Sequence, residues 1–305
     1  MLVSRSARPP ARNGHRGGAL TTTPTLARRL WEAVEPIHAV VYYAPEPAAA
    51  ARELGLAGWW MGYFAGRLAP VGTVDGPLAR SLCFAMAPRR VDRALPDAWA
   101  RTAPRKVLDS RVDAARAALE RCLPAVRHAD LRRLVLLLER AVEGCGHEGR
   151  PLAAAWAAVP RPGTLLGRLW WAATVLREHR GDGHVMAVVH AGLTGLEAGV
   201  THAATGDVSG ALLRTSRGWT DDEWAWACRR LTARGLLTRA GRLTRSGGAL
   251  RRSVEDATDH LAAAPVTLLG SSGVEDVIAV AAPLSRHLID TGVVPVPNPI
   301  GVPRP

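Results

Sequence analysis

From Leu26 onward, apolar residues recur at steps of three and four residues, and this spacing constrains the fold more than any other feature of the chain. Such steps place apolar side chains on one face of an α-helix. The pattern predicts short helices at residues 26–34, 48–54, 59–68 and 78–86, long amphipathic helices at about 104–122 and 129–144, and further helices at about 151–158, 165–178, 184–191 and 195–204. Strand patterns are almost absent before residue 235. The sequence therefore predicts a mainly α fold.

A short glycine motif occurs twice. Residues 55–58 (GLAG) and Gly62 recur as residues 192–195 (GLTG) and Gly199, at a constant offset of 137 residues. Glycines at such positions end one helix and let the next pack closely. We interpret the recurrence as two copies of a helix–helix–helix unit related by a pseudo-twofold axis. The alternative is a chance recurrence in a chain rich in Gly and Ala.

Residues 219–262 carry the clearest local pattern. A capping box at residues 220–223 (TDDE) predicts the start of a helix, and Gly235 predicts its end. Residues 236–238 then resemble a short strand, residues 239–242 a turn, and Leu243 the start of a return strand before a further helix through Leu261. Helix, two-stranded wing and helix form the second half of a winged helix-turn-helix. The predicted fold class is therefore mainly α, with tandem winged-helix-like repeats and a short β-hairpin wing in the C-terminal half.

A length of 305 residues favours two domains of about 150 residues each. The predicted parts are a disordered basic arm at 1–23, an N-terminal helical, winged-helix-like domain at 24–148, a C-terminal winged-helix domain at 149–292 and a Pro-rich tail at 293–305. The tail is polyproline-like and is expected to pack across the body as a strap, with partner recognition as the alternative. Because the duplication can replace a dimer's twofold axis, a monomer and a homodimer both remain open.

The chain has a formal net charge of +12, and only one of its 39 basic residues, Lys106, is a lysine. Such an arginine bias is typical of a GC-rich genome, so part of the charge reflects base composition. A basic folded part still favours polyanions such as nucleic acid, or anionic substrates. No uninterrupted apolar run approaches the about 20 residues that span a bilayer, and residues 1–20 lack the apolar core of a signal peptide. We therefore expect a cytoplasmic protein with no membrane partner and with reduced cysteines.

Arginines gather on the predicted recognition helix and beside its wing. The candidate DNA-binding residues are Arg229, Arg230, Arg234, Arg239, Arg242 and Arg245. The N-terminal end of a recognition helix usually meets base edges, but here Asp221, Asp222 and Glu223 occupy it. These acids stabilise the helix dipole and repel phosphates. DNA contact and a solvated basic surface on a scaffold helix are therefore both open readings.

Residues 31–64 hold seven of the fifteen aromatic residues. Aromatic walls with a few polar groups suit a pocket for a flat organic ligand, and ordinary helix packing is the alternative. Residues 177–184 (REHRGDGH) form the most polar stretch inside a helical half, where Asp182 is expected to cap the following helix. The candidate ligand-binding residues are His38, Tyr42, Tyr63, Arg67, Glu178, His179, Asp182 and His184.

Catalytic and cofactor motifs give little support for an enzyme. His179 and His184 are five residues apart, which is not the spacing of a helical metal pair, so no metal site is expected. Glu178, His179 or Asp182 can act as a general acid or base, but no nucleophile is placed near them. No Walker or dinucleotide motif occurs, and no cofactor is expected. Whether the protein catalyses a reaction stays open.

Three phrases together resemble one actinobacterial family. Residues 30–38 (LWEAVEPIH) and 62–70 (GYFAGRLAP) resemble its N-terminal signature, residues 176–184 (LREHRGDGH) its central one and residues 297–299 (PNP) its end. The chain thus resembles the SalK-like helix-turn-helix family over about residues 25–303. The resemblance implies a tandem winged-helix-like architecture and a MarR-like transcriptional regulator, often near specialised-metabolite genes. It supplies no catalytic residue.

Two functions from different classes fit these observations. The first is a MarR-like transcriptional regulator that binds DNA and senses a small aromatic or polyketide-like ligand. The second is a small-molecule-binding protein or enzyme of specialised metabolism, built on a winged-helix scaffold that does not bind DNA. The net charge and the resemblance favour the regulator, and the acidic helix start favours the alternative. We favour the regulator.

Overall fold

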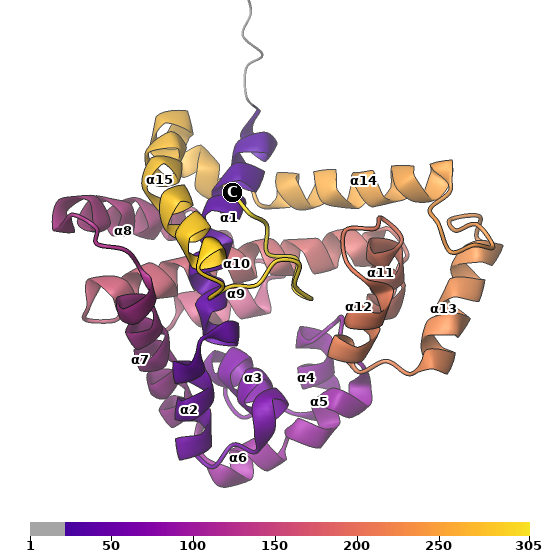
Figure 1. Cartoon of the computed structure of the whole chain (residues 1–305), viewed down its shortest axis with the longest axis horizontal. Helices are drawn as coiled ribbons and strands as arrows, with labels where there is room; N and C mark the ends of the chain where they lie inside the picture. The colour runs from indigo at the N-terminus through magenta and orange to yellow at the C-terminus, as the bar shows by residue number, and fades with distance from the viewer. Residues whose placement is uncertain (1–21) are drawn as a thin grey trace, which may run out of the picture.

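A computed structural model describes residues 22–305 as α-helices joined by short loops (Figure 1). The helices of the N-terminal half are α1 (Thr23–Tyr43), α2 (Pro45–Glu53), α3 (Gly58–Leu68), the 3-10 turn η1 (Ala69–Val71), α4 (Gly76–Leu82), α5 (Pro88–Ala94), α6 (Asp97–Arg101), α7 (Pro104–Cys122) and α8 (His128–Glu143). They are followed by α9 (Pro151–Ala157), α10 (Leu165–His190), α11 (Gly195–Ala203), α12 (Gly210–Arg217), α13 (Asp221–Ala233), α14 (Arg245–Leu261) and α15 (Ala264–Asp290). The arm predicted at residues 1–23 lies outside the described residues, apart from its last two.

The predicted β-hairpin wing is wrong, because no β-strand occurs within residues 22–305. The segment between α13 and α14 contains a single isolated antiparallel bridge, from Leu237 to Leu243. Gly235, with φ +70°, ends α13, and the Thr244 side chain caps α14 by accepting a hydrogen bond from Gly247 N–H. The turn at residues 238–242 is closed by a hydrogen bond from Thr238 N–H to the Arg242 carbonyl at 2.8 Å, so only Leu237 and Leu243 are left to pair. The described chain is all α, and we call residues 234–244 the α13–α14 loop.

The two copies of the glycine motif have closely similar backbone structures. Gly55 and Gly192 both adopt the left-handed conformation, with φ +76° and +67°. In the first copy the N–H of the next residue, Leu56, donates to the Ala51 carbonyl, and in the second copy Leu193 donates to the Val188 carbonyl in the same pattern. This helix-ending motif satisfies the last carbonyls of α2 and α10 and turns the chain into α3 and α11.

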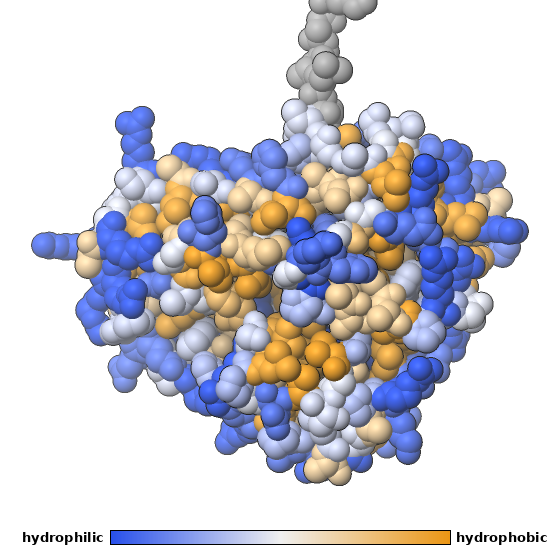
Figure 2. Space-filling view, turned by 180° about the vertical axis from the view of Figure 1, so that it is seen from behind, coloured by the Kyte–Doolittle hydropathy of each residue, from blue (hydrophilic) through white to orange (hydrophobic). Residues whose placement is uncertain are grey.

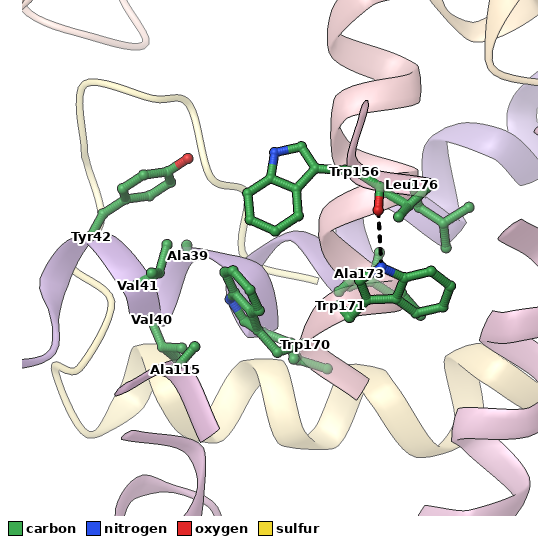
Figure 3. Packing of buried hydrophobic residues seen from close by; sticks show 14 of the residues in the cluster. Ala39, Val40, Val41, Tyr42, Ala115, Trp156, Trp170, Trp171, Ala173 and Leu176 are labelled. Carbon is green, nitrogen blue, oxygen red and sulfur yellow. Dashed lines mark hydrogen bonds between the residues drawn. The ribbon is translucent and has the colours of Figure 1, made fainter. Parts of the chain in front are cut away.

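The buried apolar side chains form two clusters. The larger one joins α1, α3, α7, α8, the first half of α10 and α15, and it contains the fully buried Trp156, Trp170 and Trp171. The Trp171 Nε1–H donates to the Trp156 carbonyl at 3.0 Å, so the polar atom of a buried indole is satisfied (Figure 3). The smaller cluster joins the end of α10 to α11, α13 and α14, with Leu231 at its centre. The part of the chain from the end of α10 to α14 therefore has a core of its own.

The segment before α5 packs onto this smaller core, so that α5 lies beside α12 (Figure 1). Ala87 N–H donates to the Arg217 carbonyl at 3.0 Å, and the Trp219 Nε1–H donates to the Ala85 carbonyl at 3.2 Å. Gly195 allows the closest approach, because a Cβ there would overlap the Phe84 carbonyl. Backbone contacts therefore fix the first half of the chain against the second.

One helix in the described part, α15, is long and apolar enough to cross a membrane by length and composition. It packs against α1 and α8, and Gly270, with φ +71°, interrupts its helical geometry. Asp276 pairs with Arg133 of α8 at 2.6 Å. These contacts hold α15 against the other helices of the fold.

The Pro-rich tail follows α15 and folds back on the protein. Asn298 is buried, and its side chain hydrogen-bonds to the backbone of Pro295, Ile300 and Val302. The Pro299 carbonyl accepts a hydrogen bond of 2.8 Å from Arg217 of α12. The tail thus connects α15 to α12.

Candidate functional site

The helix-turn-helix consists of α12, a short turn and α13. Gly218 ends α12 in the left-handed conformation, with φ +81°. Thr220 and Glu223 form a capping box at the start of α13, which confirms the prediction from the sequence. The Thr220 hydroxyl accepts from Glu223 N–H at 3.2 Å, and the Glu223 carboxylate accepts from Thr220 N–H at 2.8 Å. The cap fixes the residue at which α13 begins.

One face of α13 is open to solvent. The exposed side chains on this face follow helical spacing and are those of Asp222, Ala225, Trp226, Arg229, Arg230 and Ala233. Trp226 is 46% exposed, and the Arg230 guanidinium lies 4.8 Å from the centre of one of its rings. In Figure 1, α13 lies at one end of the molecule, and hydrophilic residues predominate along that edge when it is seen from behind (Figure 2). This geometry leaves α13 accessible to a partner.

All six predicted DNA-binding arginines are exposed. Two of them are engaged by the buried carboxylate of Glu197, which lies 3.3 Å from Arg230 and 3.8 Å from Arg234. The other four form no ion pair within the described chain; they are Arg229, Arg239, Arg242 and Arg245. A cationic surface therefore runs from the middle of α13 along the α13–α14 loop to the start of α14.

The acidic start of α13 is largely neutralised by the protein itself. Glu223 forms a two-pronged ion pair with Arg89 of α5, with both N–O distances at 2.8 Å, and Asp221 pairs with Arg214 of α12. Asp222 stays exposed. Two of the three acids thus hold α13 against its neighbours, which reduces their repulsion of a phosphate backbone.

The short helix α5 of the first half is not accessible in the same way as α13. Arg89 also donates to the Gly218 carbonyl, and Arg90 donates to the Thr215 carbonyl and lies 4.2 Å from the centre of a Trp60 ring. Its arginines therefore contact the protein, and α13 is the more accessible of the two helices.

Five of the predicted ligand-binding residues lie together between α1, α3 and α10. His38 bonds through Nε2 to the Tyr42 hydroxyl at 3.0 Å, and the Tyr42 and Tyr63 ring centres are 5.5 Å apart. Arg67 donates two hydrogen bonds to Glu178, at 3.1 Å and 2.9 Å. All but Arg67 are buried. The sequence separation between α3 and α10 gave no sign of this contact.

The electrostatics of these groups follow from burial and from nearby arginines. Burial alone raises the pKa of Glu178, but the charges of Arg177 and Arg67 and the Arg67 hydrogen bond bring that pKa well below its usual range. Burial and the charge of Arg177 lower the pKa of His38. At neutral pH the site therefore contains an ionised Glu178 and an uncharged imidazole.

The other three predicted ligand-binding residues face elsewhere. Asp182 accepts hydrogen bonds of 3.0 Å from two backbone N–H groups in the first turn of α9. His184 bonds to the Thr258 hydroxyl of α14 at 3.0 Å, and His179 is buried near Arg150. Burial lowers the pKa of His179 and of His184 to about 4, and it raises the pKa of Asp182 to about 6. These residues hold helices together.

The expected break between helices at residues 178 and 184 is wrong, because α10 is continuous from Leu165 to His190. Gly181 and Gly183 suggested a turn, but Gly183 serves close packing. A Cβ at Gly183 would lie 2.8 Å from Arg150 Nη1 and 3.2 Å from the Leu261 Cβ. The packing of α9 and α14 on this side of α10 outweighs the low helix propensity of glycine.

Sequence reasoning missed Arg111, whose guanidinium lies over the Tyr42 ring, and Arg217, whose charge interacts with Tyr63. A signal for Arg111 was present. It occupies the apolar face of α7 at helical spacing from Val107 and Ala115, where a charged side chain is unexpected. Among residues 22–305 no group of three or more His, Cys, Asp or Glu side chains is arranged to hold a metal ion.

Comparison with known proteins gives one match. The model of a helix-turn-helix family matches residues 27–295, which is most of the chain. No curated protein and no solved structure matches the sequence.

Proposed function

Because the chain belongs to this helix-turn-helix family, which supports a DNA-binding regulator in general, we propose that it controls transcription by placing the exposed face of α13 in a DNA major groove. Helix-turn-helix proteins read bases with the second helix of the motif, which here is α13. In this proposal the α13–α14 loop lies on the adjacent backbone, with Arg239 and Arg242 against phosphates.

The observation that carries the proposal is the set of four exposed arginines that form no ion pair within the described residues and that border the free face of α13. Each phosphate that they neutralise releases counterions, so DNA binding weakens as salt is added. Arg229 lies on the face itself and is the residue placed to contact a base edge. The neutralised acids at the start of α13 lower the repulsion that argued against this reading.

The test is fluorescence anisotropy with the protein's own upstream DNA and with a scrambled duplex, at about 50 and 200 mM salt. Arg229→Ala is expected to weaken specific binding about 10-fold or more and to reduce discrimination between the duplexes. Arg242→Ala is expected to weaken binding to both duplexes equally and to lower the salt dependence by about one counterion.

Lys106→Ala is the matched control, because Lys106 is exposed on α7, away from α13 (Figure 1). It removes one positive charge and is expected to leave DNA binding unchanged. Equal losses in all three variants would mean that net charge alone drives binding, which would contradict the proposed role of α13.

Within this function, we propose that the protein is a cytoplasmic, MarR-like regulator of the SalK-like type, associated with specialised metabolism. This assignment rests on the phrases at residues 30–38, 62–70 and 176–184. The second candidate, a small-molecule-binding protein or enzyme without DNA binding, is favoured by one observation: Asp222 stays exposed at the start of α13, where its charge repels phosphates. Weak, sequence-independent DNA retention in the anisotropy test would favour this second candidate.

A further inference from the structure

Four arginines from four helices lie close enough to Tyr42, to Tyr63 or to both for their charges to interact with these residues. They are Arg67 of α3, Arg111 of α7, Arg177 of α10 and Arg217 of α12, and we call them the arginine cluster. Each is close enough to another member for their charges to interact. So dense a positive charge away from solvent requires compensation.

The carboxylates next to the arginine cluster compensate only half of its positive charge. Glu178 forms ion pairs with Arg67 and Arg177, and Glu35 lies 3.6 Å from the Arg177 Nε. Arg111 and Arg217 are left without a carboxylate partner among the described residues. Arg217 donates only to the Pro299 carbonyl. Four guanidinium groups thus face two carboxylates.

Arg111 is the most exceptional member. It is 8% exposed, and its Nε has no hydrogen-bond partner in the described chain. Its guanidinium lies over aromatic rings, 5.6 Å from the Tyr42 ring centre and 5.9 Å from a Trp170 ring centre. Burial lowers the pKa of Arg111, which reflects the cost of keeping this charge in the interior.

The fold makes room for this guanidinium. Gly66 of α3 lies beside it, and a Cβ at that position would be 2.5 Å from Arg111 Nη1 and 3.1 Å from its Cζ. On the other side, Trp59 stacks on Tyr63 at 5.1 Å and is itself 46% exposed. Aromatic rings therefore extend from the arginine cluster to the protein surface.

We propose that Arg111 binds a small organic anion, an aromatic carboxylate, whose ring lies against Tyr42 and Tyr63. The carboxylate supplies the negative charge that the cluster lacks, and guanidinium groups bind carboxylates through paired hydrogen bonds. The aromatic side chains supply the flat apolar surface that the rest of the ligand needs.

This site also has a route to the helix-turn-helix, a step that rests on the proposed function. Arg217 is the last residue of α12, and its carbonyl accepts from Ala87 N–H. A carboxylate in the arginine cluster lowers the repulsion that Arg217 of α12 experiences from Arg67 and Arg177. Ligand binding therefore favours one position of α12 and α13 relative to the first half of the chain, and it changes DNA affinity.

The binding test needs no DNA. The purified full chain is titrated with benzoate, 1-naphthoate and 4-hydroxybenzoate by calorimetry and thermal shift, and with the neutral analogue benzamide. At least one carboxylate is expected to bind saturably and to raise the melting temperature, whereas benzamide has no effect. If no carboxylate binds the wild-type protein up to about 10 mM, or if benzamide binds equally well, the site is refuted.

Two variants separate ligand binding from stability. Arg111→Met removes the unpartnered charge at similar volume, so it is expected to raise the melting temperature of the free protein while weakening carboxylate binding about 10- to 100-fold. Lys106→Met on the same helix is the control and changes neither. Gly66→Ala keeps the charge but occupies the space of the guanidinium, and it is expected to weaken binding as well. Carboxylate affinity in Arg111→Met equal to that of the wild type overturns the proposal.

Adding the best carboxylate to the anisotropy assay tests the regulatory step. A ligand-dependent change in DNA affinity that is absent in Arg111→Met supports it. If the carboxylate binds but DNA affinity does not change, the proposed coupling between ligand and DNA binding is overturned, while the proposed anion site still stands. If the protein binds carboxylate but no specific DNA, the proposed transcriptional function fails while the anion site stands.

Discussion

Gly195 provides the sharpest test of how the two halves of the chain fit together. A Cβ at this position would overlap the Phe84 carbonyl oxygen and would lie 2.8 Å from its carbonyl carbon and 3.1 Å from the Ala85 Cα. All three are backbone atoms, so no side-chain rotation can relieve the overlap. Gly195→Ala must therefore shift α11 away from the segment before α5.

The matched control is Gly199→Ala, one turn further along the same helix. There the nearest neighbours of a Cβ are Trp224 ring atoms at 3.8 Å and 3.9 Å, which is ordinary contact. Forced overpacking costs about 1–3 kcal/mol of stability or more. Because the atoms around Gly195 are rigid backbone, we expect the cost of Gly195→Ala to lie at the upper end of this range. Replacing an interior helix glycine by alanine gains about 1 kcal/mol. The two variants should therefore differ by about 4 kcal/mol in free energy of unfolding.

Urea unfolding followed by circular dichroism at 222 nm measures this difference. Gly195→Ala is expected to unfold at lower urea concentration than the wild type, and Gly199→Ala at the same or higher concentration. A lower slope for Gly195→Ala would indicate that the halves separate before they unfold. Equal stability of the two variants would refute the tight backbone contact and, with it, the arrangement of the two halves.

Three further predictions follow from buried polar groups. Burial lowers the pKa of His179 and of His184 to about 4 in the folded protein, so the stability that each uncharged imidazole contributes is complete above pH 6.5 and is lost as the pH falls toward 4. Each histidine should therefore lower the free energy of unfolding by about 2 kcal/mol at pH 5 relative to neutral pH. Equal urea midpoints at pH 7 and pH 5 would contradict this prediction. Asp182→Ala should lower the free energy of unfolding by about 1–3 kcal/mol and speed amide exchange in the first turn of α9, whereas Asp182→Asn keeps an acceptor and should change little. Burial raises the pKa of Cys83 to about 11 and of Cys145 to about 12, so iodoacetamide at pH 8 should label them only after unfolding, as mass spectrometry of the native and urea-treated protein will show.

Sequence patterns predicted the helices that carry a clear apolar stripe or cap. The helix at 104–122 and the capping box at Thr220 are confirmed. The errors arose where tertiary packing overrides local preference. Leu237 and Leu243 have strand-like composition, but the turn at residues 238–242 leaves these two residues to form only one bridge.

The candidate site was predictable only in part, because spacing along one helix says nothing about partners on another. The sequence grouped His38 with Tyr42 correctly, since both lie on one face of α1 and bond at 3.0 Å. It could not show that Glu178 meets Arg67 across 111 residues. Arg111 was overlooked although its position in an apolar stripe marked it, because a buried arginine becomes conspicuous only when its partners are known to be missing.

The acids at the start of α13 change meaning once the fold is known. Read alone, Asp221 and Glu223 oppose DNA binding, but in the fold their charges hold α13 against α12 and α5. The same contacts occupy Arg89, so the two halves do not present two equivalent reading helices. A helix-turn-helix dimer reads a palindrome with two such helices about 34 Å apart. If α13 is the helix that reads DNA, a palindromic operator requires two copies of this chain, and the recurrence of the glycine motif within one chain does not supply the second reading helix.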